Sequence, residues 1–176
     1  LKYLPVKKGE SKDLQWFIQP VNEKFSYGIV MLVEKKGIKT RILWKIISSE
    51  DGENWFSDGK NALLAEAQKE EREFFREHTI WWENYFGESR ISLPDKFMEK
   101  QWYMTNYLFA SASREGCAPM PLQGVWTADD GTLPPWKGDY HHDLNTELSY
   151  THYLKANHLE EGRAFLDFLW ELREEG

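Results

Sequence analysis

Cysteine, long apolar runs and excess positive charge are all scarce in this 176-residue chain, and each scarcity excludes a class of protein. The single cysteine, Cys117, excludes an internal disulfide framework and leaves the redox compartment open. No apolar run approaches the roughly 20 residues needed to cross a bilayer, so no membrane span is expected. The net charge of -7 argues against nucleic acid as a partner, because a phosphate backbone is bound by a positively charged surface.

Signal peptides, repeats and metal-binding spacings are also lacking. The missing signal peptide carries little information, since the chain opens with Leu1 rather than Met. There are no internal repeats and no low-complexity tracts. His141 and His142 lie next to Asp143, but neither a His-x-x-x-His pattern nor a cysteine pair accompanies them. We therefore expect no zinc site and no other cofactor.

Aromatic residues, in contrast, are abundant. Nine Trp, eight Tyr and ten Phe make up 15% of the chain. A large aromatic core explains much of this content, because each buried ring removes on the order of 150–250 Å² from water. Sugar-binding sites also favour aromatic residues, since a ring face packs against the C–H face of a pyranose. Both interpretations stay open for the individual tryptophans.

The first fifty residues have the pattern of β-strands. Apolar, β-branched and aromatic residues alternate or cluster in residues 13–18, 25–34 and 39–47. Gly37 lies between the last two segments, where a hairpin turn requires a positive φ. Three strands cannot enclose a core, so we expect them to join a larger sheet or to pack on a helix.

Helical spacing begins after Asp51-Gly52. We expect one helix over residues 60–86 that ends at Gly87, and further helices over 97–114, 144–156 and 159–173. Residues 117–140 carry repeated Pro and Gly and predict a long ordered loop, which in compact domains is usually functional. The last helix is apolar on more than one face, so we expect the natural polypeptide to continue past Gly176.

Polar and aromatic side chains gather where this loop meets the next helix. They are Asp139, His141, His142, Asp143, Asn145 and Glu147, beside Trp126, Trp136 and Tyr140. Carboxylates, amides and imidazoles crowded among aromatic rings suit a polyhydroxylated ligand. Hydrolysis of a glycoside also needs one group that orients water and another that protonates the leaving oxygen.

The motifs of this region resemble the signature of glycoside hydrolase family 95, which contains inverting α-L-fucosidases and some α-L-galactosidases. The motifs are Leu122-Gln123-Gly124-Val125-Trp126, Pro134-Pro135-Trp136, and residues 140–150 with Asn145-Thr146-Glu147. The resemblance implies an α+β chain, with antiparallel strands followed by helices that begin an (α/α)6 toroid. Residues 1–57 would be the C-terminal part of a β-sandwich domain, 58–90 a linker helix, and 91–176 the first helices of an incomplete six-hairpin glycosidase barrel. It also implies a periplasmic or extracellular enzyme of carbohydrate metabolism.

In that family two asparagines, one residue apart, hold and polarise the catalytic water with help from a distant aspartate. Asn145 matches the second asparagine, whereas Asp143 stands in place of the first. These two residues are the catalytic candidates. The candidates for substrate binding are His141, His142, Trp126, Trp136, Tyr140 and Glu147. Of these, His141 matches a histidine that contacts the sugar in some members of the family. The family's general acid lies far downstream, so the 176 residues alone are expected to be inactive.

Simpler roles and other functions stay open. Asp143 or Asn145 could cap the helix that follows, and Glu147 could complement its dipole. Asp143 could act as the general base or mark a degenerate site. The leading hypothesis is a glycosidase that removes a terminal sugar such as α-L-fucose or α-L-galactose from oligo- or polysaccharides. The alternatives are a non-catalytic carbohydrate-binding homologue, or another glycosidase or a phosphorylase on the same barrel. The expected partners are the saccharide and the remainder of the polypeptide.

Overall fold

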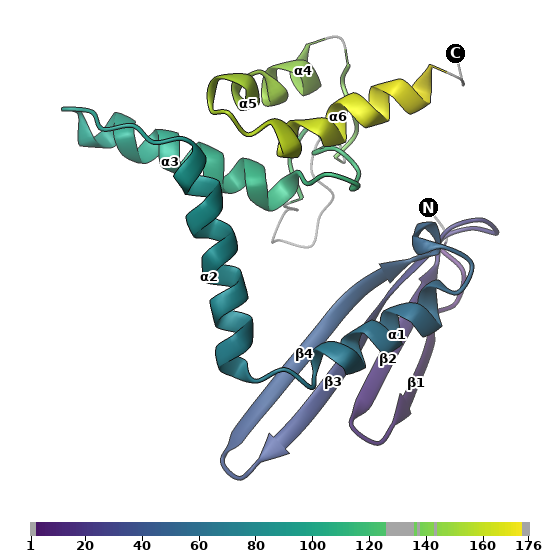
Figure 1. The fold of residues 1–176 in the computed structure, drawn as a ribbon. Coiled ribbons are helices and arrows are strands. Elements are labelled where there is room, and N and C mark those ends of the chain that lie inside the picture. Colours follow the sequence, from purple (N-terminus) through teal and green to yellow (C-terminus); the bar gives the residue numbers. More distant parts are fainter. Residues whose placement is uncertain (1–2, 126–135, 137, 143, 174–176) are drawn as a thin grey trace. The chain divides into compact units, whose positions relative to one another are not determined.

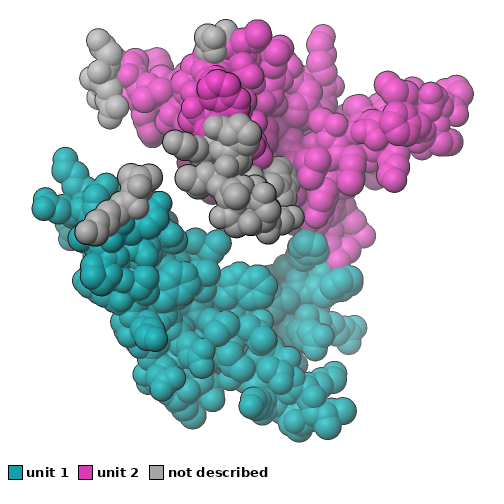
Figure 2. Space-filling view, turned by 180° about the vertical axis from the view of Figure 1, so that it is seen from behind, with its two compact units in different colours: residues 1–78 teal, residues 79–176 magenta. Residues whose placement is uncertain are grey.

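The computed structural model describes residues 3–125, 136, 138–142 and 144–173 (Figure 1). The chain divides into two compact units, Leu1–His78 and Thr79–Gly176, coloured teal and magenta in Figure 2. A four-stranded antiparallel sheet precedes the helices, so the expected α+β class is confirmed. No helix within the described ranges is both long and apolar enough to cross a membrane.

The first unit contains a sheet of four consecutive antiparallel strands. They are β1 (Lys7–Ser11), β2 (Leu14–Pro20), β3 (Ser26–Lys36) and β4 (Lys39–Ser48), in spatial order β1-β2-β3-β4. Gly37 has a φ of 64° in the β3–β4 turn, as predicted. Strand β1 was not predicted, because its residues include no β-branched or aromatic side chain. It forms through backbone pairing with β2 at the edge of the sheet.

A short 3-10 helix, η1 (Ser49–Asp51), leads from the sheet to helix α1 (Trp55–Glu66), which lies along one face of the sheet (Figure 1). Successive strand residues point to opposite faces, so every second residue meets this helix. The resulting core consists of Leu14, Val30, Leu32, Ile47, Leu63 and Ala67. Gly59 of α1 lies directly against Ile47, and a Cβ at Gly59 would collide with that side chain. The helix therefore approaches the sheet closely.

The opposite face of the sheet is also apolar. Ile42, Trp44 and Ile46 of β4 are 50%, 64% and 69% exposed. Trp44 lies opposite Met31 in the register. No element among the described residues covers this face. The assignment of residues 1–57 to a β-sandwich stays a prediction, and an apolar face of this kind is what a second sheet covers in a sandwich.

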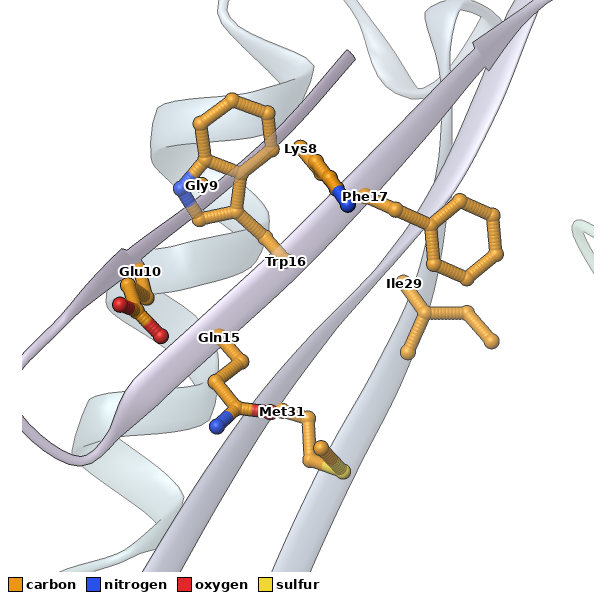
Figure 3. A pocket seen from close by; sticks show the side chains of 8 residues that line it. All are labelled: Lys8, Gly9, Glu10, Gln15, Trp16, Phe17, Ile29 and Met31. Atoms are coloured by element: carbon orange, nitrogen blue, oxygen red, sulfur yellow. The ribbon is translucent and has the colours of Figure 1, made fainter. Parts of the chain in front are cut away.

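A surface pocket of about 660 Å³ lies along strands β1, β2 and β3 (Figure 3). Its lining residues are Lys8, Gly9, Glu10, Gln15, Trp16, Phe17, Ile29 and Met31. The indole of Trp16 lies against Gly9, where any larger residue would meet the ring. Phe17, Ile29 and Met31 are on the uncovered apolar face. The pocket therefore continues that face and has none of the predicted site residues.

The helix expected over residues 60–86 is in fact two helices. Helix α1 ends at Glu66 and α2 (Glu71–Glu88) begins after a short connection. Arg41 of β4 fixes this connection, because its guanidinium donates to the carbonyl oxygens of Ala67 at 3.1 Å and Lys69 at 2.9 Å. Gly87 does not end the helix as predicted, since α2 continues to Glu88.

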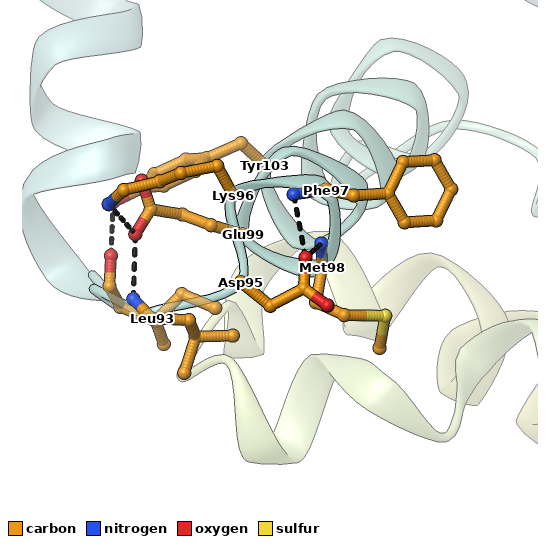
Figure 4. A network of polar contacts seen from close by, with 8 residues as sticks. Leu93, Asp95, Lys96, Phe97, Met98, Glu99 and Tyr103 are labelled. Carbon is orange, nitrogen blue, oxygen red and sulfur yellow. Dashed lines mark hydrogen bonds and ion pairs between the residues drawn. The ribbon is translucent and has the colours of Figure 1, made fainter.

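The described part of the second unit contains the end of α2 and four more helices. They are α3 (Lys96–Ala112), α4 (Asn145–Tyr150), α5 (His152–Lys155) and α6 (Leu159–Leu172). Asp95 caps α3, since its carboxylate accepts from the amides of Phe97 and Met98, while Glu99 accepts from the amide of Leu93 (Figure 4). The helix expected over residues 144–156 is broken at Thr151 into α4 and α5.

Two aromatic clusters form the core of this unit. Phe109, Tyr150, Tyr153 and Phe165 pack together with Met120 in the first cluster. In the second, Trp81 stacks on Tyr85 while the Arg114 guanidinium lies 3.4 Å from the Trp81 ring centre. His158 is fully buried and stacks on Tyr85. The core interpretation of the aromatic content is therefore correct for the buried rings of Tyr85, Phe109 and Tyr150.

Candidate active site

The candidate site lies in the connection between α3 and α4, whose two ends are tied together. The amide of Leu122 donates to the carbonyl oxygen of Asp139 at 3.1 Å. The hydroxyl of Tyr140 donates to the carbonyl oxygen of Pro119 at 2.9 Å. As predicted, the described residues between 117 and 140 form no helix or strand. The bonds between the two ends place the Pro119–Leu122 segment beside the residues that precede α4.

A buried hydroxyl anchors the start of this connection. Tyr150 of α4 is 1% exposed, and its hydroxyl oxygen accepts from the amide of Met120 at 2.6 Å. Ser113, at the end of α3, donates its hydroxyl proton to the carbonyl oxygen of Glu161 at 2.7 Å and lies 2.9 Å from the Tyr150 oxygen. Tyr150 is therefore the donor to Ser113, because the only proton of Ser113 is already used. Burial raises the pKa of Tyr150, which keeps the hydroxyl protonated for this role.

In the segment from Asp139 to His142, side chains two residues apart contact each other. On one side, Oδ1 of Asp139 lies 3.1 Å from Nε2 of His141. On the other side, the rings of Tyr140 and His142 stack at 5.6 Å with an interplanar angle of 8°. The predicted residues of this segment therefore form two groups rather than one.

The first group faces solvent. Trp136 is 59% exposed, and its ring meets the ring of His141 edge to face at 5.3 Å. The His141 side chain keeps 28% of its surface exposed, so a ligand can reach it. These two candidates for substrate contact lie together with Asp139, which was not among the candidates.

The second group packs inward against α6. The rings of Tyr140 and His142 lie 5.2 Å and 5.5 Å from that of Phe168. Burial raises the pKa of Tyr140, whose hydroxyl is already bonded to Pro119. His142 buries Nδ1 without a hydrogen-bond partner among the described residues. Their packing gives both residues a structural role, and their contact with a substrate stays a prediction.

Asn145 and Glu147 lie in the first turn of α4. Asn145 is exposed and is the first residue of the helix, whereas Leu144 occupies the cap position and makes no side-chain cap bond. Capping therefore does not account for Asn145. Glu147 buries Oε2 without a partner in the part of the chain that is described. The other catalytic candidate, Asp143, and the predicted sugar contact Trp126 both lie outside the described residues.

Thr146 and Asp139 lie in the motif region, but no role in the site was predicted for either of them. Thr146 is 1% exposed. Its hydroxyl oxygen accepts a hydrogen bond from the amide of His141 at 3.1 Å. The amide of Thr146 in turn donates to the carbonyl oxygen of His141 at 2.9 Å. This reciprocal pair fixes the main chain of His141 to the first turn of α4. The spacing of Asp139 and His141 by two residues was the available signal, because it puts both on one side of an extended segment.

The exposed group can bind a neutral polyhydroxylated molecule. Trp136 supplies an apolar ring, and the amide of Asn145 is both a donor and an acceptor. Nε2 of His141 is turned toward Asp139, which leaves Nδ1 as the ring nitrogen that can bond a hydroxyl group. No cluster of His, Cys, Asp and Glu among the described residues is suited to hold a metal ion.

Comparisons with known proteins agree with this chemistry. The model of the "Glycosyl hydrolase family 95 catalytic domain" matches residues 82–176, which include the whole candidate site. "Probable alpha-fucosidase A" of Aspergillus niger is 46% identical over 44 residues, or 25% of this chain. "Alpha-L-fucosidase 2" of Arabidopsis thaliana is 36% identical over 63 residues, or 36% of this chain. The matched segments span 5% and 7% of these two relatives. No solved structure matches the chain.

Proposed function

Because the chain belongs to glycoside hydrolase family 95, we propose that it is the part of an inverting, α-fucosidase-like glycosidase that orients the catalytic water. The substrate would be a terminal sugar such as α-L-fucose or α-L-galactose on an oligo- or polysaccharide. The observation that carries the proposal is the match of the catalytic-domain model across residues 82–176. The exposed Trp136 and Asn145 and the partly exposed His141 support it, because they offer the groups that a neutral sugar needs.

Asn145 and Asp143 would act on the water. An inverting glycosidase needs a base and a water on the face of the sugar opposite the leaving group. The exposed amide of Asn145 would orient this water, and the carboxylate of Asp143 would take its proton in place of the asparagine usual in the family. The general acid, a glutamate in the family, would lie outside these 176 residues. The chain alone would then bind sugar without cleaving it.

The proposal is tested by assaying the natural-length protein on an aryl α-L-fucoside, with α-L-galactosides and related glycosides as a panel. We expect Asp143→Ala and Asn145→Ala each to lower kcat by roughly 100-fold or more, the lower end of what a positioned base contributes. Asp167→Ala is the matched control, because this carboxylate is exposed on α6 and its ion pair among the described residues is with Arg163. A wild-type protein that hydrolyses none of the panel would contradict the proposed glycosidase function. Full activity of Asp143→Ala would show that Asp143 is not the base.

A second candidate function is a non-catalytic carbohydrate-binding protein. The observation that favours it is Asp143 itself, which departs from the asparagine of the family pattern. Calorimetric binding of L-fucose by a natural-length protein that hydrolyses none of the panel would support this alternative. We also propose a periplasmic or extracellular location, on the family resemblance alone, and cell fractionation tests it.

A further inference from the structure

We propose that Asp139 is a positioning residue, which holds the imidazole of His141 so that Nδ1 forms a hydrogen bond with a hydroxyl group of the sugar. This inference rests on the proposed function for its ligand. It adds to that function a second carboxylate, acting through His141 and separate from the water-activating pair of Asp143 and Asn145.

The first step of the argument is the proton on His141. A carboxylate only accepts hydrogen bonds, so the 3.1 Å contact between Oδ1 of Asp139 and Nε2 of His141 puts the proton on Nε2. The second ring nitrogen, Nδ1, is then the one left to bond a ligand. Among the described residues no side chain or amide is bonded to Nδ1. The partial exposure of the ring leaves this nitrogen available to a ligand.

The second step is the restraint on the main chain. The amide and carbonyl of His141 are both bonded to the buried Thr146, next to Asn145. The carbonyl of Asp139 accepts from Leu122, and its amide donates to the carbonyl oxygen of Trp136 at 3.1 Å. With both backbones fixed, the main freedom left to His141 is rotation of its side chain. Asp139 and the edge contact with Trp136 restrict that rotation.

The third step is selectivity. Every neutral sugar supplies hydroxyl groups, and a hydroxyl group can form a hydrogen bond with a ring nitrogen such as Nδ1. The Asp139 carboxylate keeps half of its surface exposed beside the ring, so a carboxylated or phosphorylated sugar would bring a second negative charge close to it. The dyad therefore favours neutral or deoxy sugars over acidic ones.

A double-mutant cycle on the natural-length protein tests the inference through kcat/KM for an aryl α-L-fucoside. We expect Asp139→Ala to lower kcat/KM about tenfold, the effect of one hydrogen bond to a charged group. Because Asp139 acts only through His141, the same substitution should have no further effect in a His141→Ala background. Asp139→Asn serves as a second variant of unchanged size that tests the charge, and Asp167→Asn is the matched surface control.

The outcomes separate this inference from the function on which it rests. An inactive wild type defeats the proposed function, and this inference with it. An active wild type in which Asp139→Ala has no effect defeats the inference alone. So does an equal loss on removing Asp139 with and without His141, because a residue that merely holds the fold would act in both backgrounds. A loss of kcat/KM on Asp139→Ala that occurs when His141 is present and not in the His141→Ala variant, with unchanged circular dichroism, supports the proposed pairing of Asp139 and His141.

Discussion

The hydroxyl of Tyr150 is the part of the site whose removal has the most specific expected effect. Tyr150→Phe deletes one atom and keeps the ring that packs against Phe109 and Phe165. It removes the acceptor of the Met120 amide and the donor to Ser113. Ser113 keeps its bond to the carbonyl oxygen of Glu161. The perturbation therefore falls on the start of the connection that leads to the candidate site.

The magnitude follows from the groups left without partners. A buried amide that loses its acceptor costs about 1–3 kcal/mol. Taking about 2 kcal/mol, local opening around Met120 becomes about 30-fold more frequent. Native-state hydrogen exchange of the natural-length protein measures this opening, and we expect the amide of Met120 to exchange about 30-fold faster in the variant.

Tyr153→Phe is the matched control. Tyr153 belongs to the same aromatic cluster and is 9% exposed, but within the described part of the chain its hydroxyl has no hydrogen bond. We expect this variant to change the exchange rate of Met120 by no more than about twofold, as for a substitution worth at most 0.5 kcal/mol. Equal exchange rates in the two variants would refute the anchoring role of the Tyr150 hydroxyl.

Two further predictions concern the stability of the second unit. Gly162→Ala should destabilise the second unit by about 1–3 kcal/mol, because the added Cβ meets the ring of Tyr153. A urea denaturation midpoint equal to that of the wild type would contradict this contact. Burial lowers the pKa of His158 to about 4 from its ordinary value near 6.5. The contribution of neutral His158 to the free energy of unfolding is therefore fully present above about pH 6.5 and is lost as the pH falls to about 4. The total loss is about 3 kcal/mol. Urea denaturation of the wild type and His158→Phe across that range measures the loss, and the same pH dependence in both proteins would contradict this origin.

The regular elements were predictable where local pattern decides them. Alternation in β3 and β4 and the glycine between them located the hairpin. Edge strand β1 was missed, because backbone pairing rather than composition forms it. The break between α1 and α2 has neither Pro nor Gly, and Arg41 reaches it from a strand far away in the sequence. A tertiary contact of this kind leaves no signal in a local pattern.

The candidate site was only partly predictable. The motif located its residues, but it did not divide them between the exposed pair of Asp139 and His141 and the inward stack of Tyr140 and His142. That division depends on contacts between side chains two residues apart, which the motif alone does not reveal. The anchor at Tyr150 joins residues 30 positions apart, and only the folded chain brings them together.

The anomeric form of the released sugar tests the central claim most directly. ¹H NMR of the natural-length protein acting on an aryl α-L-fucoside distinguishes the first product from the form that appears later by mutarotation. The proposed water-activating pair of Asp143 and Asn145 predicts β-L-fucose as the first product, because water attacks the face opposite the leaving group. Initial release of α-L-fucose would show retention through a covalent intermediate, and would contradict the mechanism proposed for this site.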